Sequence, residues 1–268
     1  MTAVSAPLAT PVARSALLRE LGIAAVAGSI AGILVGGIGG RVAMRISGAM
    51  SDQALVGIAR TDNGNVLGEI TFGGTLALLI FVGFFAGVLG GIFYTAGRPW
   101  LRPLGRWAGL AFGLALLAAA GSLVLDPFNI DFRKFGVPVV NVALFAALFP
   151  LFGIAHMLLA ETVERRMPRT LAWEIPAAGV AALVVGLLAI TTVGSLIEGD
   201  GQDLGFLFPP VALAVLVSLR VVLGSGGLLT DARSLRPRDL ILSYGLLLAP
   251  VLAGLPATIA AIGVLARI

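Results

Sequence analysis

Long apolar runs alternate with short polar stretches along most of the chain. Seven of these runs approach the ~20 residues that an α-helix needs to cross ~30 Å of hydrocarbon. They lie at residues 17–46, 72–97, 104–125, 137–162, 174–197, 206–223 and 239–265. The pattern therefore predicts an all-α integral membrane protein whose seven transmembrane helices form one domain, residues 16–268.

The segment before the first run, residues 1–15, is rich in small residues, contains proline and shows no periodicity. We expect a disordered cytoplasmic tail there. A cleaved signal peptide is the alternative, but the apolar stretch at residues 21–40 is longer than the ~7 to 15 residues of a signal core.

Glycine recurs every four residues inside the first three runs, which on a helix gives one face without side chains. We call such a face a glycine ridge. Membrane helices use small residues to bring their backbones into contact, so we expect the ridges to pack these helices together. A glycine-lined pore and a homo-oligomer seam are the alternatives. The predicted packing glycines are Gly28, Gly32, Gly36, Gly40, Gly83, Gly87, Gly91, Gly109 and Gly113.

Composition agrees with a membrane protein, since 58% of residues are hydrophobic, 12% are charged and mean hydropathy is +1.03. The net charge of +4 comes from arginines clustered between the runs, a pattern that orients membrane proteins and does not indicate nucleic-acid binding. Eleven flanking basic residues lie on the side of the N-terminus and six on the opposite side. We therefore expect a cytoplasmic N-terminus and an external C-terminus.

The loop between the first two runs contains Asn63-Gly64 between β-compatible residues. This pair suits a type I′ turn, so the loop predicts a small external β-hairpin between the first and second helices. At residues 126–136, Asp126 precedes Pro127 and is expected to N-cap a short interfacial helix. Phe128, Phe132 and Phe135 would then share one face of that helix.

Three short motifs carry a resemblance to known proteins. They are GGIGGRVAMR at residues 36–45, Asp62-Asn63-Gly64, and Arg98-Pro99-Trp100-Leu101. Together they resemble a group of uncharacterised multi-pass membrane proteins from high-GC bacteria. The resemblance implies a multi-pass protein of the bacterial cell membrane, and it implies no activity.

Ionisable residues near the ends of the runs are candidates for function, because charges at membrane depth are costly. On the outer side, Arg41 and Arg45 lie one helical turn apart, at the level of Asp126 and Asp131. These four residues either form an ion-pair cluster that holds the first helix in place or bind an external anion.

A second group lies toward the cytoplasmic side: Tyr94, His156, Arg220 and Tyr244. We predict that these residues bind a substrate, with Arg220 as the anchor for an anionic group and His156 as a proton-coupling residue. The alternatives are that Arg220 extends its side chain to the interface and that His156 donates to a backbone carbonyl.

Two functions fit these patterns. Pro150, Pro250 and Pro256 interrupt the fourth and seventh helices, as in transporters with a site near the midplane. We therefore expect a small-molecule or ion transporter with a cavity between the fourth, sixth and seventh helices, in a 3+1+3 arrangement. The alternative is a non-catalytic scaffold or accessory subunit whose glycine ridges bind a membrane partner or a second copy.

Several other chemistries are disfavoured. The chain has no cysteine, so disulfides and thiolate metal sites are excluded. Its one lysine, Lys134, lies in an outer loop, so a retinal Schiff base in the last helix is excluded. The Gly-rich run at residues 36–40 lacks the strand and lysine of a nucleotide-binding loop, and no acidic segment completes a Ca²⁺-binding pattern. We expect no metal and no cofactor, with the lipid bilayer as the main partner. The patterns leave enzymatic activity open and favour a protein without it.

Overall fold

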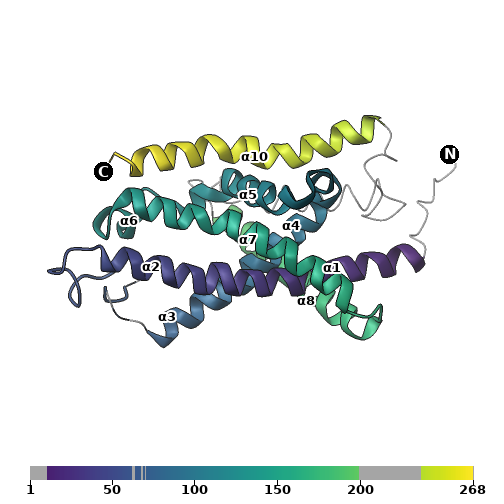
Figure 1. Ribbon diagram of the computed structural model, residues 1–268, viewed down its shortest axis with the longest axis horizontal. Coiled ribbons are helices and arrows are strands. Elements are labelled where there is room, and N and C mark those ends of the chain that lie inside the picture. Colours follow the sequence, from purple (N-terminus) through teal and green to yellow (C-terminus); the bar gives the residue numbers. More distant parts are fainter. Residues whose placement is uncertain (1–10, 62–63, 68, 70, 199–236, 268) are drawn as a thin grey trace.

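The computed structural model describes residues 11–61, 64–67, 69, 71–198 and 237–267 (Figure 1). The predicted sixth helix and Arg220 lie outside the described residues, as do Asp62 and Asn63. The described residues are helical, without strands. The elements are α1 (Pro11–Ala31), η1 (Gly32–Gly39), α2 (Gly40–Ala49), α3 (Phe72–Ala77), η2 (Leu78–Phe85), α4 (Ala86–Leu101), η3 (Arg102–Trp107), α5 (Ala108–Val124), α6 (Ile130–Lys134), α7 (Pro138–Arg166), α8 (Leu171–Glu198) and α10 (Pro237–Leu265).

Five helices in the described part of the chain are long and apolar enough to cross a membrane: Leu18–Ala49, Phe72–Arg98, Arg102–Val124, Pro138–Arg166 and Leu248–Leu265. They match five of the predicted runs, and a shorter apolar helix, Leu171–Leu187, lies in the fifth run. Such helices are compatible with a membrane protein. The count of seven, the 3+1+3 arrangement and the orientation stay predictions.

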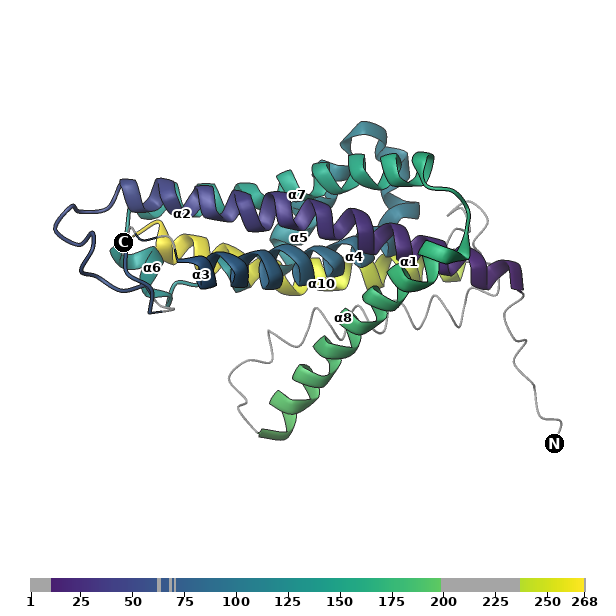
Figure 2. The same cartoon turned by 90° about the horizontal axis from the view of Figure 1, so that it is seen from below.

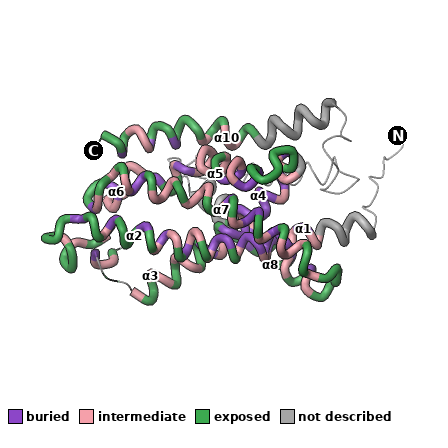
Figure 3. The backbone as a smooth tube through the Cα atoms, viewed as in Figure 1, coloured by how far each residue is buried: buried purple, intermediate pink, exposed green. Residues whose placement is uncertain are grey.

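The helices lie lengthwise beside one another, except that α8 leaves the bundle at an angle (Figures 1 and 2). The long helix of α1, η1 and α2 begins at Pro11, inside the range expected to be a tail. Buried residues gather where α1, α4, α7 and α8 meet (Figure 3). One core cluster there joins Ala24, Val88 and Ala181 from three of these helices.

The first two long helices touch through their glycines. A Cβ built on Gly32 would lie 2.6 Å from the Cα of Gly87, and one built on Gly87 would lie 2.8 Å from the Cα of Gly32. Gly28 likewise faces the carbonyl of Gly87. Real Cβ atoms do not approach so closely, so these backbones meet only because side chains are missing. Both helices are π-helical at this crossing, over Gly32–Gly39 and Leu78–Phe85.

A second glycine contact joins α5 and α7. A Cβ on Gly109 would lie 2.8 Å from the carbonyl oxygen of Gly153, and one on Gly113 would lie 2.5 Å from the Cα of Pro150. The next contact brings α10 onto α5, where Gly254 faces the carbonyl of Ala119. Gly153 and Gly254 are not part of the predicted ridges. The helices α7 and α10 each bring a single glycine to these contacts, so the sequence shows no four-residue repeat there.

The end of the bundle that holds α6 is organised by short polar contacts. The Ser51 hydroxyl accepts a hydrogen bond of 2.8 Å from the Gly136 amide, and the Asn141 side chain donates one of 2.7 Å to the carbonyl of Phe135. In the preceding loop, Arg60 and Val66 form an isolated antiparallel bridge. The β-hairpin stays a prediction, since its turn lies partly outside the described residues.

The predicted cap of the interfacial helix is wrong. The Asn129 side chain caps α6 by accepting a hydrogen bond of 2.8 Å from the Asp131 amide. Asp126 instead accepts one of 2.8 Å from the Phe128 amide, because the chain makes a turn before the helix starts. Phe132 and Phe135 are buried while Phe128 is 87% exposed, so these three side chains do not share one face.

Candidate functional site

The structure brings together two of the four residues of the predicted inner site. Tyr94 of α4 and His156 of α7 meet edge to face, with ring centroids 4.8 Å apart and an interplanar angle of 70°. Tyr244 lies in α10, but its side chain is outside the described residues, as is all of Arg220. The predicted cavity between the fourth, sixth and seventh helices therefore stays a prediction.

His156 is buried completely between α1, α4 and α7. Its ring stacks on Phe152 at 5.8 Å and reaches the space left by Gly91, where an added Cβ would lie 3.0 Å from Cε1 of His156. It faces the backbone of Ala27, at a geometry that forms no full hydrogen bond in the described structure. His156 therefore packs behind Tyr94.

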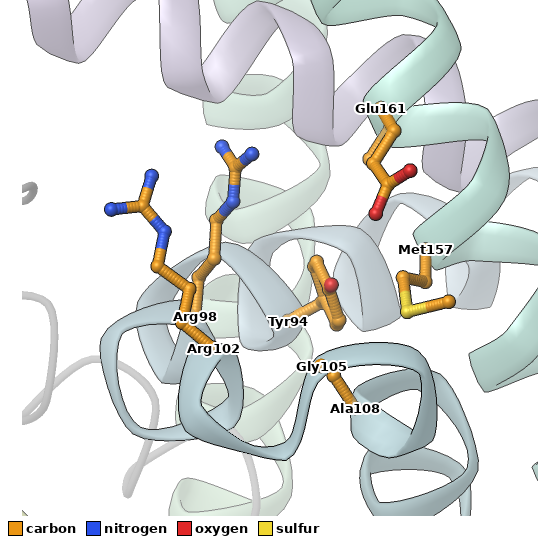
Figure 4. Close-up of a pocket in the computed structure, with 8 residues that line it drawn as sticks. Tyr94, Arg98, Arg102, Gly105, Ala108, Met157 and Glu161 are labelled. Carbon is orange, nitrogen blue, oxygen red and sulfur yellow. The ribbon is translucent and has the colours of Figure 1, made fainter.

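A cavity of about 220 Å³ lies beside Tyr94, at the end of the bundle where α4 and α7 finish (Figure 4). We call it the Tyr94 pocket. Several of its lining residues, including Arg102, Gly105 and Glu161, are exposed, so the pocket reaches the surface. The lining residues are Tyr94, Arg98, Arg102, Gly105, Ala108, Met157, Ala160 and Glu161.

Local sequence explains the shape of one wall. Tyr94, Arg98 and Arg102 follow one another at intervals of four residues, so along α4 and into η3 they share one face. The chain then turns back at Gly105, whose φ of 52° and ψ of −124° suit glycine and strain other residues. This turn brings Ala108 of α5 against the pocket.

The charges in the Tyr94 pocket are separated. The guanidinium groups of Arg98 and Arg102 lie on one side of the Tyr94 ring, and the Glu161 carboxylate lies on the other, with Met157 beside it (Figure 4). Tyr94 is buried and held by Phe112, with ring centroids 5.1 Å apart. The pocket thus has a cationic side, an anionic side and a fixed aromatic ring between them.

Ion pairs surround the Tyr94 pocket. Arg98 pairs with Glu164 of α7, and Glu161 lies 4.0 Å from Arg165 one turn further along the same helix. The first pair joins α4 to α7, whereas the second is exposed to water. Glu161, Glu164 and Arg165 all lie near the end of α7, so the position of this end of the helix determines which charges face the pocket.

Arg19 forms a separate polar junction at the same end. Its guanidinium lies 3.1 Å from Glu174 of α8 and donates to the carbonyls of Glu164 (3.0 Å) and Met167 (3.3 Å). The group also lies 5.9 Å from the centre of the Trp173 ring. Through these contacts, Arg19 fixes the connection between α7 and α8 against α1.

The four residues of the predicted outer cluster lie at the opposite end. Arg41 and Arg45 are in α2, Asp131 is in the first turn of α6 and Asp126 is in the loop before it. Nη2 of Arg41 approaches Gly74 of α3, where an added Cβ would lie 3.0 Å away. The role of this cluster as an anion site or a packing device stays a prediction.

Of the residues that line the Tyr94 pocket, the predicted site contained only Tyr94. It missed the three charged residues, which are Arg98, Arg102 and Glu161. The sequence indicates both arginines as orientation signals, because they lie in a basic segment after an apolar run, and Arg98 also belongs to one of the motifs that carry the resemblance. The signal that could have identified the two arginines is their spacing of four residues from Tyr94 and from each other, which places the three side chains on one face of a helix. Comparison with models of protein families, with curated proteins and with solved structures finds no match to this chain, so its function has to be inferred from this geometry.

Proposed function

We propose that this chain is an integral membrane protein that transports a small charged solute and binds it in the Tyr94 pocket. The observation that supports the proposal is the pocket itself: a cavity between spanning helices, lined by two arginines, a buried tyrosine and a glutamate. Arg98 and Glu161 belong to two of the helices long and apolar enough to span a membrane, and ionisable side chains within such helices commonly mark a substrate path. A cavity with a few convergent polar groups is also the usual form of a ligand site.

The size of the Tyr94 pocket favours a small solute. Its volume of about 220 Å³ is below the ~300 to 1,000 Å³ that is usual for drug-sized ligands. Arg98 and Arg102 supply planar sets of N–H donors that suit a carboxylate or a phosphate. We therefore propose that the solute carries an anionic group.

The basic residues around the pocket also support its location. Arg98, Arg102 and Arg106 lie at the same end as Arg165 and Arg166. An excess of arginine is typical of cytoplasmic loops, so we propose that the pocket and the N-terminus face the cytoplasm. The solute would then enter or leave the Tyr94 pocket on that side.

The glycine contacts favour a transporter over a scaffold that binds its partner through the ridges. Gly28, Gly32 and Gly87 face one another, and Gly109 and Gly113 face α7. A ridge that packs within the chain has no free surface for a partner helix. We propose that the glycines hold the helices around the Tyr94 pocket.

Uptake into liposomes tests the proposal. The purified chain should accumulate members of a panel of small radiolabelled anions and amino acids, and Arg102→Gln should reduce that uptake at least about tenfold. Arg106→Gln is the matched control, because Arg106 is an arginine of the same turn that does not line the pocket. Wild-type uptake by Arg102→Gln, or no uptake of any panel member by the wild type, contradicts the proposal.

A further inference from the structure

We infer that the Tyr94 pocket takes a zwitterion, a small molecule that carries an anionic group and a primary ammonium. The inference rests on the proposed function and names the class of solute. The anionic group would lie against Arg98 and Arg102, and the ammonium would lie against the Glu161 carboxylate. This orientation follows from the separation of the charged side chains across the Tyr94 ring (Figure 4).

A solute with a single charge fits this lining poorly. A simple anion that reaches the arginines also meets the like charge of the Glu161 carboxylate in the same small cavity. A simple cation that reaches Glu161 meets Arg98 and Arg102. A zwitterion, in contrast, offers each wall the opposite charge.

The ion pairs around the pocket support the same conclusion. Arg98 already faces Glu164, and Glu161 already faces Arg165. Any anionic group that reaches Arg98 competes with Glu164 for it. A lone anion adds a negative charge beside that carboxylate, whereas a zwitterion adds one charge of each sign and leaves the local net charge unchanged.

The rest of the pocket limits the solute to a small apolar part. Ala108, Met157 and Ala160 supply apolar surface, and the Tyr94 ring is held between Phe112 and His156. The Tyr94 hydroxyl lies between the cationic and anionic sides (Figure 4). It can donate to the anionic group or accept from the ammonium.

Two sources share this chemistry. One is a free amino acid, whose carboxylate and ammonium lie on one carbon. The other is the headgroup of phosphatidylethanolamine, which carries a phosphate and a primary ammonium and is present in the bilayer itself. The exposed Leu104 and Trp107 beside the pocket are apolar surface of the kind that sits at the membrane interface.

Binding to the full chain in phosphatidylcholine nanodiscs tests the inference, with L-alanine, propionate, isopropylamine and glycerophosphoethanolamine as titrants. L-alanine or glycerophosphoethanolamine should bind at least about tenfold more tightly than the two single-charge molecules. Glu161→Gln should remove most of the preference for L-alanine over propionate. Because the Glu161 side chain is 48% exposed, this variant is expected to fold, and its unfolding curve checks that.

The outcomes separate the inference from the proposed function. Preference for L-alanine identifies a free solute. Preference for glycerophosphoethanolamine, together with loss of its binding when the nanodisc contains phosphatidylethanolamine but not when it contains phosphatidylglycerol, identifies the lipid headgroup. Both support a zwitterion. Equal binding of propionate, unchanged in Glu161→Gln, overturns the zwitterion and leaves an anion transporter. An absence of binding by every titrant, together with an absence of uptake in liposomes, overturns both.

Discussion

Arg19 of α1 and Glu174 of α8 form an ion pair of 3.1 Å in which the side chains are only 14% and 5% exposed. We predict that Glu174→Gln lowers the free energy of unfolding by about 1 to 3 kcal/mol, because a charge loses its partner in a poorly hydrated place. Arg19 keeps its bonds to the carbonyls of Glu164 and Met167, which limits the loss.

Glu161→Gln is the matched control for that measurement. Its partner Arg165 lies 4.0 Å away, and the side chains are 72% and 48% exposed, so the change should be about 0 to 1 kcal/mol without ligand. Chemical unfolding in detergent compares the two. Equal losses in both variants would show that the Arg19–Glu174 pair does not join α1 to α8.

The contact between Gly32 and Gly87 predicts a strong penalty for a single methyl group. Gly32→Ala places a Cβ 2.6 Å from the Cα of Gly87, so the helices must separate, at a cost of about 1 to 3 kcal/mol. Gly48→Ala is the control, since no described atom lies within 4 Å of its added Cβ; this variant should be unchanged or slightly more stable. Thermal unfolding that ranks Gly48→Ala as the less stable variant contradicts the packing.

Gly105 predicts a link between backbone conformation and the Tyr94 pocket. Its φ of 52° and ψ of −124° are unfavourable for alanine, so Gly105→Ala should cost about 1 to 3 kcal/mol and weaken ligand binding, because η3 must shift. Gly179→Ala, at an exposed helical glycine with no described atom within 4 Å of its added Cβ, should leave binding unchanged. Wild-type ligand binding by Gly105→Ala would show that the conformation of this turn does not affect the Tyr94 pocket.

His156 and Asn141 are both buried polar residues, and the structure predicts losses of stability of different size on replacement by leucine. The His156 ring faces the backbone of Ala27 without the geometry of a full hydrogen bond, so His156→Leu should cost less stability than Asn141→Leu. Asn141 donates at 2.7 Å to the Phe135 carbonyl, so Asn141→Leu should cost about 1 to 3 kcal/mol. Because His156 lies behind Tyr94, we expect uptake to respond to pH in the same way in the wild type and in His156→Leu. A different response in the variant would support His156 as a proton-coupling residue.

Apolar run length predicted where the helices lie, because hydrocarbon thickness sets one length for every span. Helix spacing also predicted that Gly28, Gly32 and Gly36 share a face. It did not identify the facing helix, since a periodic pattern contains no information about distant segments. Gly153 and Gly254 were missed for the same reason: a single glycine becomes a contact only when another backbone arrives there.

The Tyr94 pocket was harder to predict than the helices. Tyr94 and His156 were expected near each other because both lie close to one membrane interface. Arg98 and Glu161 belong to the ends of two helices, and a sequence does not show that these ends meet across the turn at Gly105. Charged residues at helix ends also serve as orientation signals. A sequence pattern does not distinguish that role from a role in lining the Tyr94 pocket.

Cysteine accessibility tests the Tyr94 pocket most directly, because the chain has no cysteine of its own. Ala160 lines the pocket and Ala178 lies in α8; both are only 5% exposed. We predict that a membrane-impermeant thiol reagent modifies Ala160→Cys from the cytoplasmic side, that a bound zwitterion slows the reaction, and that Ala178→Cys stays unmodified. Equal reactivity of the two variants, or labelling of Ala160→Cys that no ligand slows, would contradict a ligand site in this pocket.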